Sequence, residues 1–235
     1  MSTSTVLQPD NRPRKSPAPA WHTVLLLVLL YGVVFGSKFH AIHLPNVPLP
    51  LLYLLEFFIQ LLFFLFMLFG IHLNGNEIKD LLGPWPRDSV KLSSAAFWGL
   101  CTGCLSIGIA FCIYLLLGRF YRGSEPGIAP RNLAELLLFF ATSLTSGFWE
   151  EFTFRGYLLR QIYFFNRNLA LAVLLQAAFF TLAHGPNQTF AGVTDKMIFS
   201  VLMAWITIRC KSLLPAIIAH AFGNAILGLL AFSAR

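Results

Sequence analysis

The fold class follows from a stretch that reads LAELLLFFATSLTSGFWEEFTFRGYLLR at residues 133–160. Its first part, residues 133–148, is almost wholly apolar, which is typical of a helix in a membrane. Two adjacent acids, Glu150 and Glu151, and the basic Arg155 then follow in equally apolar surroundings. A charged side chain at membrane depth costs about 2.5–3.5 kcal/mol on insertion scales, so such residues pair, line a cavity or do chemistry.

The whole chain has the composition of a membrane protein. Of its 235 residues, 57% are hydrophobic and only 11% are charged, and the mean hydropathy is +0.69; soluble domains carry about 25% charged residues. A membrane span needs about 20 mostly apolar residues. We therefore expect an all-α, polytopic transmembrane helix bundle of six to eight helices with a polar intramembrane cavity. The predicted segments are residues 21–36 (extending as far as 44), 51–73, 92–117, 133–155, 170–184, 196–208 and 213–232.

The chain is predicted to form one transmembrane domain behind a short tail. Residues 1–20 are rich in Pro, Ser and Thr, which predicts a disordered cytoplasmic tail. Residues 21–235 show no internal repeat, and their motif-bearing core spans about residues 130–230. Basic residues at 12–15 place the N-terminus in the cytoplasm, so we expect a multi-pass protein of the cell membrane. The net charge of +7 comes from loops that orient helices and predicts no nucleic-acid partner.

The two adjacent acids are expected to differ in role. On a helix, Glu151 and Arg155 lie four residues apart on one face, and a Glu that precedes its basic partner favours an ion pair. Glu150 points about 100° away from Glu151 and is left free, which makes it a candidate general base. The alternative is a structural ion network at a helix end.

Two later histidines also lie on apolar segments. His184 ends the segment at 170–184, before a Gly-Pro helix breaker. His220 and Asn224 lie four residues apart, on one face of the last helix. A lone histidine on an apolar face is usually a core residue, but this combination indicates a functional site. If residues 166–168 form a turn, Glu150 and His184 are each 17 residues from Arg167 and lie side by side in an antiparallel hairpin.

The cysteines predict no redox or metal chemistry. Cys101 and Cys104 form a C-x-x-C within an apolar helix, where Gly99 and Gly103 form a G-x-x-x-G. Small residues at this spacing allow helices to approach closely, so we expect a packing face, which Cys104, Gly108 and Cys112 would extend.

The remaining ionisable residues of the apolar segments are assigned no catalytic role. Two acids, Glu56 and Glu135, are expected near helix starts, where an acid complements the helix dipole. Four histidines are expected at the membrane interface: His22, His40, His43 and His72.

Three motifs, in this order and spacing, resemble those of the CPBP family of CAAX-protease-like and bacteriocin-processing intramembrane endopeptidases, also called Abi. The motifs are Glu150-Glu151-x-x-x-Arg155, Phe180-x-x-x-His184 and His220-x-x-x-Asn224. The resemblance implies a helical intramembrane fold with a cavity that opens near the cytoplasmic face. It also implies hydrolysis of a peptide bond in a membrane-bound peptide or protein. This substrate could carry a lipid group, and the reaction would take place in the lipid bilayer.

The resemblance implies a role for each motif residue. Glu150 would be the general base, which activates a water molecule together with His184. His220 and Asn224 would bind the oxyanion, and Arg155 would position the acid pair.

Several alternatives stay open. No cofactor is favoured, because the zinc helix signature H-E-x-x-H is absent. The alternative is a zinc-dependent intramembrane metalloprotease with Glu150, His184 and His220 as ligands, which would leave Asn224 without a role. An ion- or proton-coupled transporter would use these residues as a proton relay, although transporters often contain internal repeats. A non-catalytic immunity or scaffold protein is the third alternative.

Overall fold

The computed structural model describes residues 15–39, 47–84, 89–117, 130–185 and 188–233, and these residues contain helices but no strand. Their helices, in chain order, are α1 (Ala20–Phe39), α2 (Leu49–Leu73), α3 (Ile78–Leu82), α4 (Ser89–Leu117), α5 (Leu133–Glu151), the π-helix η2 (Phe152–Leu158), α6 (Leu159–Asn166), α7 (Leu169–Ala183), α8 (Phe190–Cys210) and α9 (Leu214–Ser233).

The predicted helical membrane bundle is confirmed. Seven long helical stretches lie in the described part of the chain, if α5, η2 and α6 are counted as the one continuous stretch that they form. Four helices are long and apolar enough to cross a membrane, and two further helices, α1 and α7, are apolar but shorter. The chain is therefore an integral membrane protein. The four long spans are Leu49–Leu73, Lys91–Leu117, Phe190–Cys210 and Leu214–Ser233.

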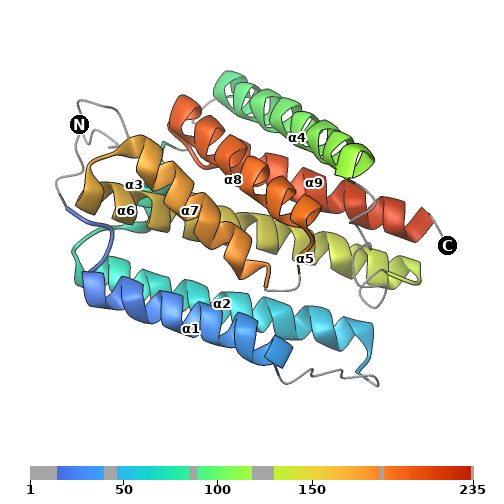
Figure 1. Cartoon of the computed structure of the whole chain (residues 1–235), viewed down its shortest axis with the longest axis horizontal. Helices are drawn as coiled ribbons and strands as arrows, with labels where there is room; N and C mark the ends of the chain where they lie inside the picture. Colours follow the sequence, from blue (N-terminus) through green and yellow to red (C-terminus); the bar gives the residue numbers. More distant parts are fainter. Residues whose placement is uncertain (1–14, 40–46, 85–88, 118–129, 186–187, 234–235) are drawn as a thin grey trace.

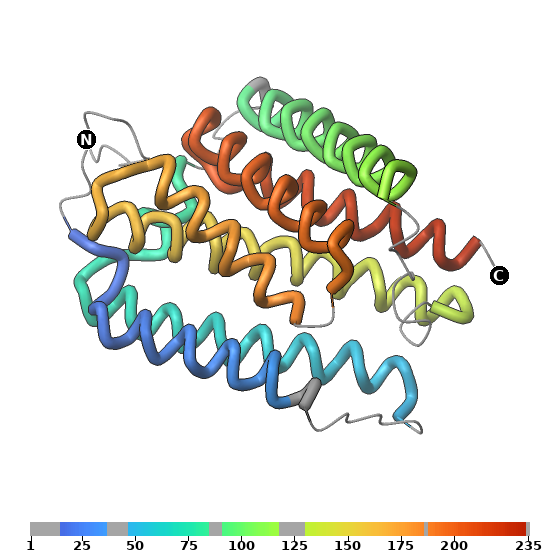
Figure 2. The backbone as a smooth tube through the Cα atoms, viewed as in Figure 1, coloured from blue at the N-terminus to red at the C-terminus, as the bar shows by residue number. Residues whose placement is uncertain are grey.

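The helices run side by side, up and down the bundle (Figure 1). α1 and α2 form a pair on one side, α4 lies on the opposite side, and α5, α7, α8 and α9 fill the space between them (Figures 1 and 2). α1 begins at one end of the bundle and α9 finishes at the other (Figure 1). The motif-bearing helices α5, α7 and α9 thus lie inside the bundle, where α2 covers one side of them.

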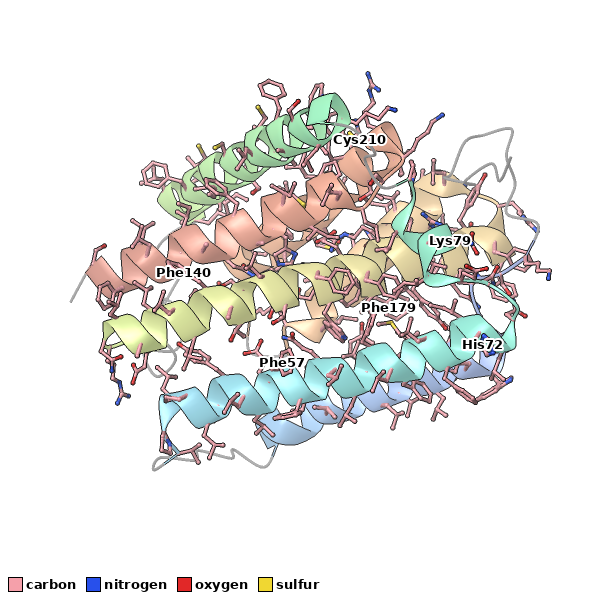
Figure 3. All side chains as sticks on the ribbon, turned by 180° about the vertical axis from the view of Figure 1, so that it is seen from behind. Phe57, His72, Lys79, Phe140, Phe179 and Cys210 are labelled. Atoms are coloured by element: carbon pink, nitrogen blue, oxygen red, sulfur yellow. The ribbon has the colours of Figure 1, made fainter. Side chains whose placement is uncertain are left out.

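One end of the bundle carries most of the described basic residues, and we call it the basic end. α3 lies at this end, where the backbone N–H of Leu213 donates to the carbonyl of Leu82. Figure 3 shows Lys79 and Cys210 at this end and Phe140 towards the other. Arg131 precedes α5 at the opposite end. The basic residues of the basic end are Lys15, Lys79, Lys91, Arg167, Arg209 and Lys211.

Glycines let α4 approach α9, as the G-x-x-x-G spacing predicts. A Cβ atom on Gly99 would lie 2.8 Å from the carbonyl oxygen of Pro215, and one on Gly103 would lie 3.2 Å from that of Ala219. The extension of this face to Gly108 and Cys112 is wrong, because no atom lies within 4 Å of a Cβ on Gly108, and Cys112 is exposed. The described cysteines are all free.

The last residues of the predicted tail pack against the helices. Ala18 is fully buried, its N–H donates to the side-chain oxygen of Gln161 at 3.2 Å, and its carbonyl accepts from the Gln161 amide at 2.8 Å. These paired hydrogen bonds hold the entry to α1 against α6. Residues 1–14 of the predicted tail lie outside the described residues.

One of the four histidines expected at the membrane interface is buried between helices. His22 is fully buried, with Nδ1 3.1 Å from the hydroxyl of Tyr157 and Nε2 3.0 Å from the carbonyl of Phe66. It therefore joins α1, α2 and η2 within the core. His72 is exposed in the last turn of α2, as expected, while residues 40 and 43 lie outside the described residues. Glu135 lies in the first turn of α5, as predicted.

Candidate active site

The acid pair lies where the backbone changes its helix type. α5 ends at Glu151, and the next seven residues form the π-helix η2, all of them buried. π-helical turns are rare, and they occur frequently at functional sites. Nothing in the residue pattern predicts this widened turn, but its residue Arg155 is the basic member of the first motif.

Glu151 and Arg155 form the predicted ion pair. Nη1 of Arg155 donates to Oε1 of Glu151 at 2.9 Å, and both side chains are 0% exposed. The same carboxylate oxygen lies 2.8 Å from Nδ1 of His220 on α9. Glu151 is thus bound to two basic groups and is closed off from any cavity.

Arg155 also connects the helices behind the acid pair. Its Nη2 donates to the hydroxyl of Ser200 at 3.0 Å, and Ser200 donates to the side-chain oxygen of Gln176 at 3.3 Å. The guanidinium carbon lies 4.5 Å from the centre of the Phe180 ring, a favourable cation–π geometry. Ser200 and Gln176 extend the polar site into α8 and α7, and sequence analysis missed both.

Glu150 is the free acid, as expected. Its side chain is 20% exposed, and its Oε2 makes no hydrogen bond with any described residue. That oxygen lies 3.8 Å from Nε2 of His220. The His220 ring therefore stands between the two carboxylates, with one nitrogen towards each.

Two cavities meet at Glu150. The α5–α9 cavity, of about 320 Å³, is lined by residues of α2, α5 and α9 that include Glu56, Glu150 and Asn224. The α1–α7 cavity, of about 370 Å³, is lined by residues of α1, α2, α5, η2 and the end of α7 that include Glu56, Glu150 and His184. Most of the other lining residues are apolar. The structure thus brings all four predicted site residues to or beside these cavities.

His184 is held by its own helix. It is the C-cap residue of α7, and its Nδ1 lies 2.9 Å from the carbonyl oxygen of Phe180. Because a carbonyl can only accept, Nδ1 carries the proton, and Nε2 of the neutral ring is then a proton acceptor. The turn that brings His184 back to the level of Glu150 is the predicted one, with Arg167 in the left-handed conformation after α6 and Asn168 as N-cap of α7.

Glu56 is a cavity residue that sequence analysis missed. It is the eighth residue of α2, well beyond the first turn, so its expected role at a helix start is wrong. Its Oε1 accepts from the Gln60 amide at 3.0 Å and from the Ser146 hydroxyl at 3.2 Å. Ser146 precedes Glu150 by one helical turn on α5. The sequence contains a pattern that could have predicted this polar pair, because Glu56 and Gln60 lie four residues apart in an otherwise apolar segment.

The side chains that the zinc alternative would use do not form a gathered metal-binding group. In the described part of the chain, no group of three or more His, Cys, Asp or Glu side chains is placed to hold a metal ion. Nδ1 of His220 is engaged with Glu151, and Nδ1 of His184 with a backbone carbonyl, so only Nε2 of each ring could bind a metal.

Comparisons with known proteins agree with the motifs. Residues 132–226 match the family described as Type II CAAX prenyl endopeptidase Rce1-like. This region begins at the N-cap of α5, and it contains all three motifs and every predicted site residue. No curated protein and no solved structure matches the chain. The chain is thus similar, over residues 132–226, to the type II CAAX prenyl endopeptidase Rce1-like family, which confirms the predicted resemblance to CPBP intramembrane endopeptidases.

Proposed function

We propose that the protein is an intramembrane endopeptidase in which Glu150 activates the attacking water. One observation carries the proposal: of the two adjacent acids, only Glu150 lines the cavities, while Glu151 is bound to Arg155 and His220. A carboxylate that is accessible to substrate and water can act as a general base, whereas one held in a buried ion pair cannot. The family match supports peptide-bond hydrolysis as the reaction.

The first step transfers a proton from water to Glu150. His184 would orient the same water through Nε2, the acceptor nitrogen of its neutral ring. As the water oxygen attacks the carbonyl carbon of the substrate, the carbonyl becomes a tetrahedral oxyanion. The C–N bond then breaks, and the proton held by Glu150 passes to the departing nitrogen.

His220 and Asn224 would stabilise that oxyanion. They lie one turn apart on α9, so Nε2 of His220 and the side-chain amide of Asn224 can address the same atom. Because Nδ1 of His220 faces Glu151, Nε2 can donate only when the ring carries both protons. A protonated His220 and Arg155 would together balance the two carboxylates, so the proposed active state has no net charge among these four groups.

The substrate would be a membrane-bound peptide or protein. The apolar walls of both cavities suit a segment within the bilayer, and the family description names prenylated CAAX sequences. The direct test is hydrolysis by purified protein, in detergent, of a peptide that ends in a prenylated cysteine and three further residues. The unprenylated peptide is assayed in parallel, with and without a chelator. Product formation supports the proposal, whereas a transporter or scaffold would form none.

Asn224→Ala should lower kcat about 10²–10³-fold, because that is the usual cost of removing one oxyanion donor. KM should change little, since the lost hydrogen bond forms only as charge develops on the substrate oxygen. Steady-state kinetics of the variant and the wild type measure both constants. If zinc were bound instead, His220→Ala protein would lose stoichiometric zinc in elemental analysis, and Asn224→Ala would be nearly silent. That pair of results would overturn the metal-free mechanism.

The charge distribution predicts on which side of the membrane the cavities open. Cytoplasmic loops carry more Lys and Arg, so we expect the basic end to face the cytoplasm. The α5–α9 cavity is lined by Pro130 and Ala231, near the opposite end. Its mouth would then face away from the cytoplasm, which differs from the opening that the family resemblance implies.

Single cysteines in a cysteine-free background test this orientation. Lys79 lies at the basic end and Arg131 at the opposite end, and both side chains are exposed. In intact cells, a membrane-impermeant maleimide should label Arg131→Cys, and it should label Lys79→Cys only after permeabilisation. The reverse pattern would place the basic end outside and the cavity mouth towards the cytoplasm.

A further inference from the structure

Glu56 is the cavity acid whose described partners carry no charge. Glu151 is paired with Arg155, and Glu150 lies near His220. Glu56, by contrast, accepts hydrogen bonds only from the neutral Gln60 and Ser146 among the described residues. Both bonds go to Oε1, which leaves Oε2 for a further partner. A carboxylate at membrane depth without a cation is costly, so its chemistry calls for a positively charged group.

A second atom beside Glu56 is also without a partner. Gln60 is only 9% exposed and lines the α1–α7 cavity, and its Oε1 is buried without a hydrogen bond to any described residue. Oε2 of Glu150 is in the same condition. Buried acceptors are normally satisfied. Oε2 of Glu56, an exposed residue that lines both cavities, is a third acceptor beside these two buried ones. A partner that satisfies all three atoms must therefore be a hydrogen-bond donor.

Hydrogen bonds to Glu56 and Ser146 fix the orientation of the Gln60 amide. Its nitrogen donates to Oε1 of Glu56 at 3.0 Å and to the hydroxyl of Ser146 at 2.7 Å, and Ser146 in turn donates to Glu56. Rotating the amide by 180° would bring its oxygen against the carboxylate of Glu56. The closed triad therefore holds Oε1 of Gln60 as an acceptor.

We propose that Glu56 and Gln60 form a subsite that binds a positively charged N–H group of the substrate. This inference rests on the proposed peptidase function. An ammonium group has three donors and no acceptor, which matches the free acceptors of the subsite. Ser146, which holds Glu56, lies one turn from Glu150, a rise of about 5–6 Å along α5. The charged group therefore belongs to a residue close to the cleaved bond.

Two groups could supply this cation. One is a lysine or arginine side chain next to the cleaved bond, which would make Glu56 a determinant of sequence preference. The other is the amino terminus that hydrolysis creates, which would make Glu56 a site of product binding. The chemistry is the same in both cases, and the experiment distinguishes them.

The first arm measures sequence preference. Prenylated peptides are prepared in pairs that carry lysine or norleucine, which lacks the charge, at one position next to the prenylated cysteine. With wild-type protein, kcat/KM should favour lysine about tenfold at one position, and in Glu56→Gln the ratio should fall to near one. Glu135→Gln is the matched control, because Glu135 lies in the exposed first turn of α5 and should leave the ratio unchanged.

The second arm needs only wild-type protein, so its result does not depend on whether a variant folds. Short product peptides with a free or an acetylated amino terminus are compared as inhibitors of norleucine-peptide cleavage. About tenfold stronger inhibition by the free amine, with no lysine preference in the first arm, assigns the subsite to the released amino terminus. Equal inhibition together with a lysine ratio near one overturns the proposal.

A measurement of peptide binding tests the cation subsite independently of the proposed hydrolysis. Fluorescent lysine and norleucine peptides are titrated into Glu150→Gln protein, and the Kd values are compared. If wild-type protein cleaves no peptide, the proposed function fails. Tighter lysine-peptide binding that Glu56→Gln removes would still support the cation subsite. Equal Kd values for the two peptides, together with equal Kd values for free and acetylated product peptides, would overturn it.

Discussion

Glu150→Gln should reduce hydrolysis about 10²–10⁴-fold, the range that general-base catalysis contributes. The amide keeps the size of the carboxyl group but cannot take a proton from water. The protein should stay folded, because the Glu150 side chain is partly exposed to the cavities and its Oε2 has no hydrogen bond to break. Peptide cleavage and a thermal melt in detergent, measured on one preparation, test both statements.

Glu135→Gln is the matched control for this variant. It removes a carboxylate from the same helix, but from its exposed first turn, so activity and melting temperature should stay at wild-type values. Full activity in Glu150→Gln would refute the proposed base.

Glu151→Gln should instead destabilise the protein, by about 3–5 kcal/mol, because breaking a buried ion pair leaves an uncompensated charge. The charge in question is the guanidinium of Arg155, which is 0% exposed. The weakened hydrogen bond to Nδ1 of His220 adds to the cost. The free energy of unfolding in detergent, compared with that of Glu150→Gln, measures the difference between the two acids.

A double variant separates lost pairing from lost volume. Removing the stranded charge with Arg155→Met in the Glu151→Gln background should restore part of the stability, since an apolar residue can replace a buried charge without an electrostatic penalty. An unchanged melt in Glu151→Gln combined with loss of activity would reverse the roles of the two acids.

The helices were predictable because a membrane allows few backbone conformations. Backbone groups in hydrocarbon must be satisfied within the segment, so an apolar run such as residues 51–73 becomes the helix Leu49–Leu73 almost unchanged. The Glu151–Arg155 pair was predictable for a similar reason, because a buried cation needs a partner within reach. The hairpin that returns His184 to the level of Glu150 followed from counting residues on either side of one turn.

Contacts between distant helices could not be predicted in this way. Each lone polar residue of an apolar segment has many potential partners, and only the packing of the bundle decides among them. Glu56 was therefore assigned to a helix start, although it faces Ser146 of α5, and the contact between His22 and Tyr157 of η2 was missed. The helix type of η2 could not be predicted either, since its residues have no pattern that separates a π-helix from an α-helix.

The π-helix has a consequence for how far the family region can stand alone. Its Tyr157 lies in hydrogen-bonding distance of His22 and Thr23, and in the following turn the guanidinium of Arg160 donates to the backbone carbonyl of Asp80. These anchors come from residues 15–82, which precede the matched residues 132–226. If residues 132–226 were moved into another protein, they would carry every motif. They would lose the hydrogen bonds from residues 15–82 that hold the π-helix in place. The family region therefore depends on α1 and α3, which lie outside it, to keep the wide turn in place.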